Sequence, residues 1–217
     1  MGMNTMHQFT PGQHVHFVGI GGYGLSAIAR ILLERGCHVT GSDRAQNALS
    51  AALAADGAVI YEGHDAAYVD GAEVIIMSSA VPADHVEVAA ARSQGIPVYK
   101  RSQIIAAVMA GQIGIAVAGT HGKTTTSSMI THVLREAGAN PSYIVGGILG
   151  NTGTNAGTGT GPAFVIEADE YDNMFHGLRP QLAVITNLEY DHPDFFQSPA
   201  ELQASFVGFA DRLAADG

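Results

Sequence analysis

The 217-residue chain has a single cysteine, Cys37, and no tryptophan. One cysteine cannot form an internal disulfide, which excludes the disulfide framework of small secreted domains. The segment Met1–Pro11 carries no basic stretch followed by an apolar run, as a secretory signal would require. We therefore expect a cytoplasmic protein.

Positive charge is also scarce, since 10 Lys and Arg stand against 20 Asp and Glu, and Lys100 and Lys123 are the only lysines. This acidic balance argues against nucleic acid as a partner. Gly, Ser, Thr or a charged residue interrupts every apolar run well before it could span a bilayer, so we expect no contact with a membrane. The 47% hydrophobic content suffices for one large domain or two of about 100 residues.

Glycine, by contrast, is abundant, at 27 of 217 residues. Glycines spread through helices and strands would destabilise them by about 0.5–1 kcal/mol each relative to alanine. Here they gather in the segments 19–24, 119–122 and 146–161, and each segment follows a short apolar run typical of a strand. This placement predicts loops with special backbone conformations.

The first half of the chain alternates strand and helix patterns, which is typical of a parallel sheet with helices on both faces. The fold class is therefore α/β, beginning with a Rossmann-like domain. Strands are expected at 14–20, 38–42, 58–61, 73–78 and 96–99, and helices at 25–35, 45–56, 84–94 and 102–110.

The pattern restarts after a break at Gly111-Gln112, which places the domain boundary near residue 110. We expect a first domain over 1–110 and a second, P-loop-type α/β ATPase domain beginning at 111 and continuing to 217. The segment 146–161 is too long for a passive connection, so we expect it to contact substrate; disorder is the alternative. Expected strands are 114–118, 144–145, 163–167 and 182–187, and expected helices 124–136 and 198–214.

The first glycine cluster, Gly19-Ile20-Gly21-Gly22-Tyr23-Gly24, has the spacing G-x-G-x-x-G between a predicted strand and a predicted helix. This spacing directs free N–H groups and the positive helix end at phosphates. Asp43 follows Gly24 by 19 positions, at the end of the next strand, where a ribose hydroxyl is usually held. The motif predicts NAD or another diphosphate-containing nucleotide, and a tight turn without ligand is the alternative.

The second cluster, Gly119-Thr120-His121-Gly122-Lys123-Thr124-Thr125, is similar to a phosphate-binding P-loop. It departs from the strict pattern, because the first glycine of G-x-x-x-x-G-K-[ST] falls at Val117. Backbone N–H groups would surround nucleotide phosphates, Lys123 would add charge at the β and γ oxygens, and the Thr124 hydroxyl would bind Mg²⁺. We expect His121 to shape the loop.

Acidic residues follow two later strands, in Glu167-Ala168-Asp169-Glu170-Tyr171-Asp172 and in Asn187-Leu188-Glu189-Tyr190-Asp191-His192. In a parallel sheet both segments emerge at the edge where the P-loop lies. Mg²⁺ prefers oxygen ligands, so a carboxylate, a Thr hydroxyl and phosphate oxygens suit it, whereas His192 is a softer ligand. Acidic residues that cap helices beside a solvated histidine are the alternative.

Taken together, these motifs resemble the Mur ligases, the ATP-dependent amide synthetases that build the peptidoglycan stem peptide. The resemblance runs over nearly the whole chain in the family's order. It rests on GIGGYG, GSD at Gly41–Asp43, SSA at Ser78–Ala80, GTHGKTTT at Gly119–Thr126, GTNA at Gly153–Ala156, EADE at Glu167–Glu170 and TNLEYDH at Thr186–His192.

The resemblance implies that ATP, Mg²⁺, UDP-N-acetylmuramate and L-alanine are the ligands, joined through an acyl phosphate. The first domain would then bind UDP, not NAD. The implied UDP-sugar contacts are Gly21, Gly22, Gly24, Asp43, Ser78, Ser79, Arg101 and Asn155. The implied ATP contacts are Gly119, Thr120, His121, Gly122, Lys123, Thr124 and Thr125. Lys123, Glu167 and His192 would be catalytic, and Thr124, Glu167 and His192 would hold metal.

Three other functions stay open at this point. Tyr171 stands where the L-alanine-adding enzymes usually have serine, which favours a recycling ligase that attaches murein tripeptide to the same UDP-sugar. An NAD-dependent oxidoreductase would use the first loop but has no need for the second, and a non-catalytic nucleotide-binding module would hydrolyse no ATP. The resemblance also implies a truncated chain, inactive alone, that lacks the rest of the ATPase domain and a C-terminal amino-acid-binding domain.

Overall fold

The computed structural model describes residues 8–217, so part of the stretch Met1–Pro11 lies outside the described residues. The chain folds into two compact units, of which the first ends at Val108 and the second begins at Met109. No helix in the described part is long and apolar enough to cross a membrane.

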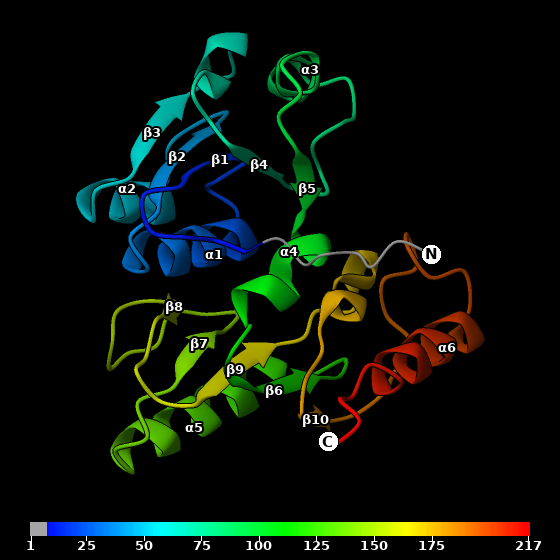
Figure 1. Ribbon diagram of the computed structural model, residues 1–217. Coiled ribbons are helices and arrows are strands. Elements are labelled where there is room, and N and C mark those ends of the chain that lie inside the picture. The colour runs from blue at the N-terminus through cyan, green and yellow to red at the C-terminus, as the bar shows by residue number, and fades with distance from the viewer. Residues whose placement is uncertain (1–7) are drawn as a thin grey trace. The chain divides into compact units, whose positions relative to one another are not determined.

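The first unit contains a five-stranded sheet in the order β3-β2-β1-β4-β5 with every strand pair parallel, which confirms the Rossmann-like prediction. Its strands are β1 (His14–Val18), β2 (His38–Asp43), β3 (Val59–Glu62), β4 (Val74–Met77) and β5 (Val98–Lys100). Its helices are α1 (Tyr23–Glu34), α2 (Ala48–Ala55), the 3₁₀ turn η1 (Ala66–Val69), α3 (Val86–Ser93) and α4 (Arg101–Val108). In Figure 1, α1 and α2 lie to one side of this sheet and α3 to the other.

Apolar side chains on both faces of this sheet are buried beneath helices. Val18, Ile75 and Met77 pack with Val88 and Ala91 of α3 in one buried cluster. The ridge of α1 that faces the sheet is also buried, and its members are Leu25, Ala27, Ile28, Ala29, Ile31 and Leu32. Strands buried on both faces are typical of parallel sheets covered by helices.

Most element boundaries differ from the prediction by one or two residues, and two of the differences have a clear local reason. β1 ends at Val18, not at residue 20, because Gly19 adopts a φ of +87° that a strand cannot continue. Helix α2 begins at Ala48, not at residue 45, because the Asn47 side chain accepts the N–H groups of Leu49 and Ser50 and caps the helix.

The second unit contains a five-stranded sheet in the order β10-β6-β9-β7-β8. Its strands are β6 (Ile113–Ala118), β7 (Ser142–Ile144), β8 (Ala156–Gly157), β9 (Ala163–Glu167) and β10 (Leu182–Ile185). Its helices are α5 (Lys123–Glu136), the 3₁₀ segment η2 (Tyr171–Gly177) and α6 (Pro199–Ala210). The strand β8 was not predicted, and it pairs antiparallel with β7, so the sheet is mixed.

The segment 146–161 is therefore partly built into this sheet, through β8. Tyr143 and Val145 lie beside it and pack with Leu149 and Val165, and Ile130 and Leu134 of α5 cover this cluster. Disorder, the alternative for this segment, is thus wrong for the part that forms β8.

Two further elements were predicted too long at their C-terminal ends. β10 ends at Ile185, not at residue 187, because Thr186 and Asn187 turn toward the loop after β6. Helix α6 ends at Ala210, not at residue 214, and the Ala214 N–H donates instead to the Pro180 carbonyl, 2.9 Å away.

Candidate functional site

The glycine turn after β1 closes on itself and on the next strand. The Gly19 N–H donates to the Ser42 carbonyl at 2.9 Å, and the Gly22 N–H donates to the Gly19 carbonyl at 3.2 Å. Helix α1 then begins at Tyr23 with no side-chain cap. The positive end of α1 and its first N–H groups therefore face the turn, as the motif predicts for an anion site.

Asp43, at the end of β2, supports this turn directly. Its Oδ2 accepts the Gly21 N–H at 2.8 Å, and its Oδ1 accepts the Arg44 N–H at 2.8 Å. A side chain at Gly21 would approach Asp43 Oδ2 at 2.9 Å and Asn47 Nδ2 at 2.7 Å. The carboxylate therefore fixes the glycine turn in addition to bordering the space beside it.

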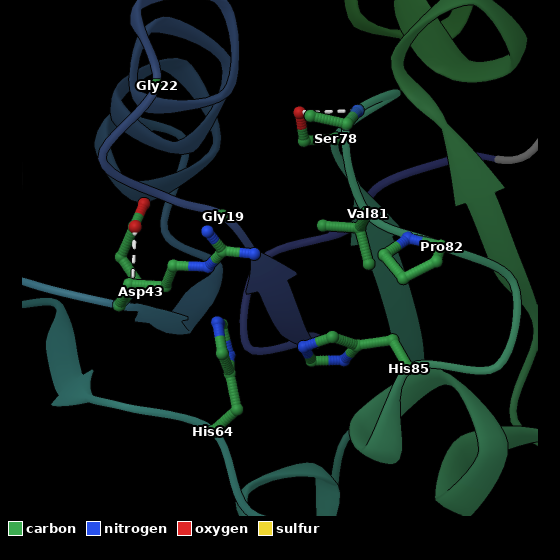
Figure 2. Close-up of a pocket in the computed structure, with 10 residues that line it drawn as sticks. Gly19, Gly22, Asp43, His64, Ser78, Val81, Pro82 and His85 are labelled. Carbon is green, nitrogen blue, oxygen red and sulfur yellow. Dashed lines mark hydrogen bonds between the residues drawn. The ribbon is translucent and has the colours of Figure 1, made fainter.

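A cavity of about 460 Å³ opens beside the glycine turn (Figure 2). Three predicted UDP-sugar contacts line it, namely Gly22, Asp43 and Ser78. The rest of its lining is Gly19, Arg44, His64, Ala80, Val81, Pro82 and His85. The imidazoles of His64 and His85 both point into this space in Figure 2, and sequence reasoning did not single them out.

The other predicted contacts have different surroundings. A side-chain Cβ at Gly24 would overlap the Arg101 guanidinium, so Arg101 lies directly over the glycine motif. Ser79 is exposed. Asn155 belongs to the second unit, where only 3% of it is exposed and its carbonyl accepts the Val145 N–H at 2.9 Å.

The loop between β6 and α5 is held by the residues that follow β10. Its glycines Gly119 and Gly122 have φ values of +130° and +83°. Asn187 Oδ1 accepts the His121 N–H at 2.9 Å, and the Thr186 hydroxyl donates to the His121 carbonyl at 2.6 Å. The structure therefore confirms that the loop Gly119–Thr125 and the segment after β10 meet at one edge of the sheet.

Lys123, the first residue of α5, donates to three oxygens. Its Nζ lies 2.6 Å from the Gly119 carbonyl, 3.2 Å from the Thr120 carbonyl and 2.9 Å from Glu170 Oε1. His192 Nε2 lies 3.5 Å from the same Glu170 oxygen. Lys123 and His192 thus converge on Glu170, a carboxylate that the sequence offered only as one of several acidic residues.

Glu170 is 1% exposed, and its Oε2 has no hydrogen-bond partner within the described residues. A buried, unpartnered carboxylate oxygen is costly unless a cation or donor satisfies it. A hard divalent cation beside phosphate oxygens fits this requirement, so the donor set is compatible with Mg²⁺. The predicted ligand Glu167 has its Oε2 on the Gly146 N–H at 2.8 Å, and Thr124 lies near the adjoining Gly147.

His121 and Tyr171 contact residues that surround Lys123, Glu170 and His192. His121 is largely exposed, and its Nε2 lies 3.7 Å from Glu189 Oε2. The Tyr171 hydroxyl donates to Asp194 Oδ2 at 3.0 Å, and that bond raises the pKa of the phenol. The Tyr171 ring meets the His192 ring edge to face, with centroids 5.3 Å apart.

A buried polar network near the first cavity escaped sequence reasoning. Glu87 is fully buried, its Oε2 accepts from Ser42 Oγ at 2.7 Å and contacts His16 Nε2 at 2.9 Å, and its Oε1 contacts His64 Nδ1 at 2.9 Å. Burial alone would raise the pKa of this carboxyl, but the hydrogen bonds from His16, Ser42 and His64 outweigh it and hold the pKa below its ordinary value. No motif links these residues, so spacing could not reveal them.

These features define a protein with a Rossmann-like unit followed by a P-loop-type α/β unit. Residues 14–113 match the family described as "Mur ligase family, catalytic domain", and residues 117–217 match "Mur ligase middle domain". The chain belongs to the Mur ligase family.

Individual relatives agree with this assignment. The UDP-N-acetylmuramate--L-alanine ligase of a Nocardioides species is 52% identical over 203 residues, which are 94% of this chain and 46% of that protein. The enzyme of the same name from an Arthrobacter species is 47% identical, over 94% of this chain and 44% of its own length. The chain therefore spans less than half the length of these curated relatives.

Two solved structures share the fold. The UDP-N-acetylmuramate:L-alanyl-gamma-D-glutamyl-meso-diaminopimelate ligase of Neisseria meningitides has a TM-score of 0.87 at 35% identity, over 95% of this chain and 70% of that one. The UDP-N-acetylmuramate-alanine ligase of Thermotoga maritima has a TM-score of 0.85 at 31% identity, over 92% of this chain and 47% of that one.

Proposed function

We propose that the chain is the UDP-sugar-binding and nucleotide-binding part of a cytoplasmic ligase that joins L-alanine to UDP-N-acetylmuramate at the expense of ATP. The observation that carries the proposal is the convergence of Lys123 and His192 on Glu170 at the P-loop. The identity of 52% to an L-alanine ligase supports the choice of amino acid.

In this proposal the first unit binds the UDP-sugar. Gly21, Gly22 and Gly24 place backbone and the N-terminus of α1 near the diphosphate, a position that favours anions. Asp43 and Ser78 would contact the ligand from the cavity wall, and Ser79 and Arg101 are further contacts from neighbouring segments. Asn155, in the second unit, stays a predicted contact of the UDP-sugar.

The second unit would bind ATP along Gly119–Thr125. Lys123 would exchange one of its carbonyl contacts for a phosphate oxygen and so neutralise charge at the transferred group. Thr124, Glu167 and His192, together with Glu170, would hold Mg²⁺. When bound, Mg²⁺ supplies charge neutralisation for the clustered phosphates.

The chemistry that these residues would serve has two steps. The lactyl carboxylate of the UDP-sugar attacks the γ-phosphorus of ATP, which forms an acyl phosphate and releases ADP. The amine of L-alanine then attacks the acyl carbon, and the tetrahedral intermediate expels inorganic phosphate as the amide forms. The residues named above orient the phosphates and balance their charge, while no side chain of this chain forms a covalent bond to substrate.

A ligation assay on protein of the relatives' full length tests the proposal. With ATP and UDP-N-acetylmuramate present, we expect kcat/KM for L-alanine to exceed that for the tripeptide L-alanyl-γ-D-glutamyl-meso-diaminopimelate by about 100-fold or more. Release of phosphate without a UDP-sugar product, or no ATP consumption at all, would contradict it. Calorimetry of the 217-residue chain distinguishes the ligase from an oxidoreductase. The ligase should bind UDP-N-acetylmuramate, whereas binding of NAD without binding of the UDP-sugar would indicate an oxidoreductase.

Tyr171 favours a second candidate, the ligase that attaches the tripeptide. Its hydroxyl bonds to Asp194 and its ring contacts His192, so it shapes the site more than a serine would. The Neisseria meningitides ligase, whose name includes the tripeptide, superposes on this chain with a TM-score of 0.87. A preference for tripeptide over L-alanine in the same assay would establish this alternative.

Replacing Gly24 with alanine should weaken UDP-sugar binding by about tenfold, equivalent to about 1.4 kcal/mol. The new Cβ would overlap the end of the Arg101 side chain, and this flexible side chain would move away without unfolding the unit. Calorimetric titration of the 217-residue chain with UDP-N-acetylmuramate measures the change.

The variant Arg101→Gln and the double variant Gly24→Ala/Arg101→Gln complete the test. If the alanine acts by displacing Arg101, the two single changes will not add, because one interaction is lost in both. Arg135→Gln is the charge control, because this arginine is exposed on α5 of the second unit, and the variant should keep the affinity. Additive losses, or full affinity in the Gly24 variant, would show that the alanine does not act through Arg101. Full affinity in Arg101→Gln would show that Arg101 does not contact the ligand.

A further inference from the structure

Beside the glycine turn, three metal-ligating side chains gather outside the proposed ATP site. A ring nitrogen of His64, a ring nitrogen of His85 and a carboxylate oxygen of Glu87 all lie within 4.8 Å of one another. His64 Nδ1 lies 2.9 Å from Glu87 Oε1, and the two imidazole rings meet edge to face with centroids 4.4 Å apart. The proposed contacts to the UDP-sugar and to ATP include none of these three side chains, although His64 and His85 line the same cavity as Asp43 and Ser78.

We propose that His64, His85 and Glu87 form a binding site for a divalent transition-metal ion, with Zn²⁺ as the best fit. Two imidazoles and one carboxylate are a donor set that suits Zn²⁺ and its neighbours, whereas Mg²⁺ and Ca²⁺ prefer oxygen alone. The site is distinct from the proposed Mg²⁺ site, which belongs to the other unit, and it does not rest on the proposed ligase reaction.

The distances allow such a site with a small movement. Zinc–ligand bonds of about 2.0–2.2 Å in a tetrahedron place neighbouring ligand atoms roughly 3.4 Å apart. The distance of 2.9 Å between His64 Nδ1 and Glu87 Oε1 is slightly shorter than that separation. The largest distance allowed among the three ligand atoms, 4.8 Å, is longer than it. His85 can supply the movement, because the hydrogen bond that its Nδ1 accepts from the Glu87 N–H is long, at 3.4 Å.

The carboxylate is already oriented for this role. Its other oxygen, Glu87 Oε2, contacts His16 Nε2 at 2.9 Å and Ser42 Oγ at 2.7 Å, and His16 Nδ1 contacts Thr40 Oγ1 at 2.8 Å. Outer partners of this kind hold the ligands of metal sites in place.

The fourth position of the tetrahedron faces the cavity. His64 and His85 both line that space, and Figure 2 shows their rings directed into it from opposite segments. Glu87 is fully buried and does not line the cavity itself. Water or an oxygen of a bound ligand would complete the coordination, as in zinc sites with three protein ligands.

Zinc calorimetry of the chelator-treated 217-residue chain tests the proposal, with excess Mg²⁺ present to occupy the second unit. We expect one equivalent of Zn²⁺ to bind and one equivalent of Co²⁺ to give the visible absorption of a tetrahedral complex. His85→Asn and His64→Asn should each weaken Zn²⁺ binding by about 100-fold or more, since even outer-partner changes at metal sites cost 10–100-fold.

Two control variants test whether the ion binds at the proposed site or elsewhere. His132→Asn removes an exposed histidine of the second unit, and His192→Asn removes the histidine beside Glu170; both should keep the Zn²⁺ affinity. Circular dichroism establishes that each variant is folded. The proposal is overturned if the unaltered chain binds no Zn²⁺, if folded His85→Asn binds it undiminished, or if His192→Asn loses it.

Discussion

Lys123→Ala, in protein of the relatives' full length, is expected to lower ATP-dependent ligation by about 1000-fold, the upper range for losing one charge-stabilising donor. The substitution removes the ammonium group that bridges the loop carbonyls and Glu170. It also leaves a carboxylate that is 1% exposed without its cationic partner. Steady-state release of phosphate and formation of the UDP-sugar product measure the loss.

The chain offers a matched control, because its other lysine, Lys100, is exposed and lies in the first unit. Lys100→Ala should ligate at the normal rate. Calorimetry on the Lys123 variant should give unchanged affinity for UDP-N-acetylmuramate, because that ligand is assigned to other residues. Normal turnover by folded Lys123→Ala would remove the P-loop role from the proposal.

Glu87→Gln is expected to lower the free energy of unfolding by about 3 kcal/mol, within the range for breaking a buried, charged network. Glutamine would remove the negative charge of this network, and its amide nitrogen would replace either the oxygen that contacts His64 or the one that contacts His16 and accepts from Ser42. Urea unfolding of the 217-residue chain measures the change. Glu62→Gln, at an exposed position on β3, should alter the stability by less than about 0.5 kcal/mol.

The same carboxyl gives the stability a defined pH dependence. Its pKa in the folded chain lies below the ordinary value of 4.5, so its contribution is present above that pH and is lost as the pH falls through the folded value. The stability difference between the unaltered chain and Glu87→Gln should therefore shrink as the pH falls below 4.5. A difference that stays constant down to the acid transition would show that the charge of Glu87 contributes nothing.

The parts of the molecule that sequence could predict are those whose determinants are local. The glycine spacing of Gly19–Gly24, the Gly-Lys-Thr run and the alternation of apolar segments each lie within a few neighbouring residues, and each marks the correct element. The strand β8 could not be predicted, because its two residues pair with β7 through the fold and carry no pattern of their own.

The contacts between side chains were harder to predict than the strand β8, because they join residues far apart in the chain. His16 and Glu87 are separated by 71 positions, and Lys123 and Glu170 by 47. Both pairs form only because parallel strands bring distant segments to one edge or one face of a sheet. Glu170 was visible as one acidic residue among several, but nothing in the spacing distinguished it from Glu167 or Asp169.

The hydrogen bonds by which Thr186 and Asn187 fix the loop between β6 and α5 have a kinetic consequence. Their bonds to His121 span 65 and 66 positions of the chain, so the loop acquires its shape only when β10 has docked beside β6. Contacts of such long sequence range slow folding, because the intervening chain must be ordered first. Competence to bind a nucleotide should consequently appear among the last events of folding in this unit, well after helix α5 has formed.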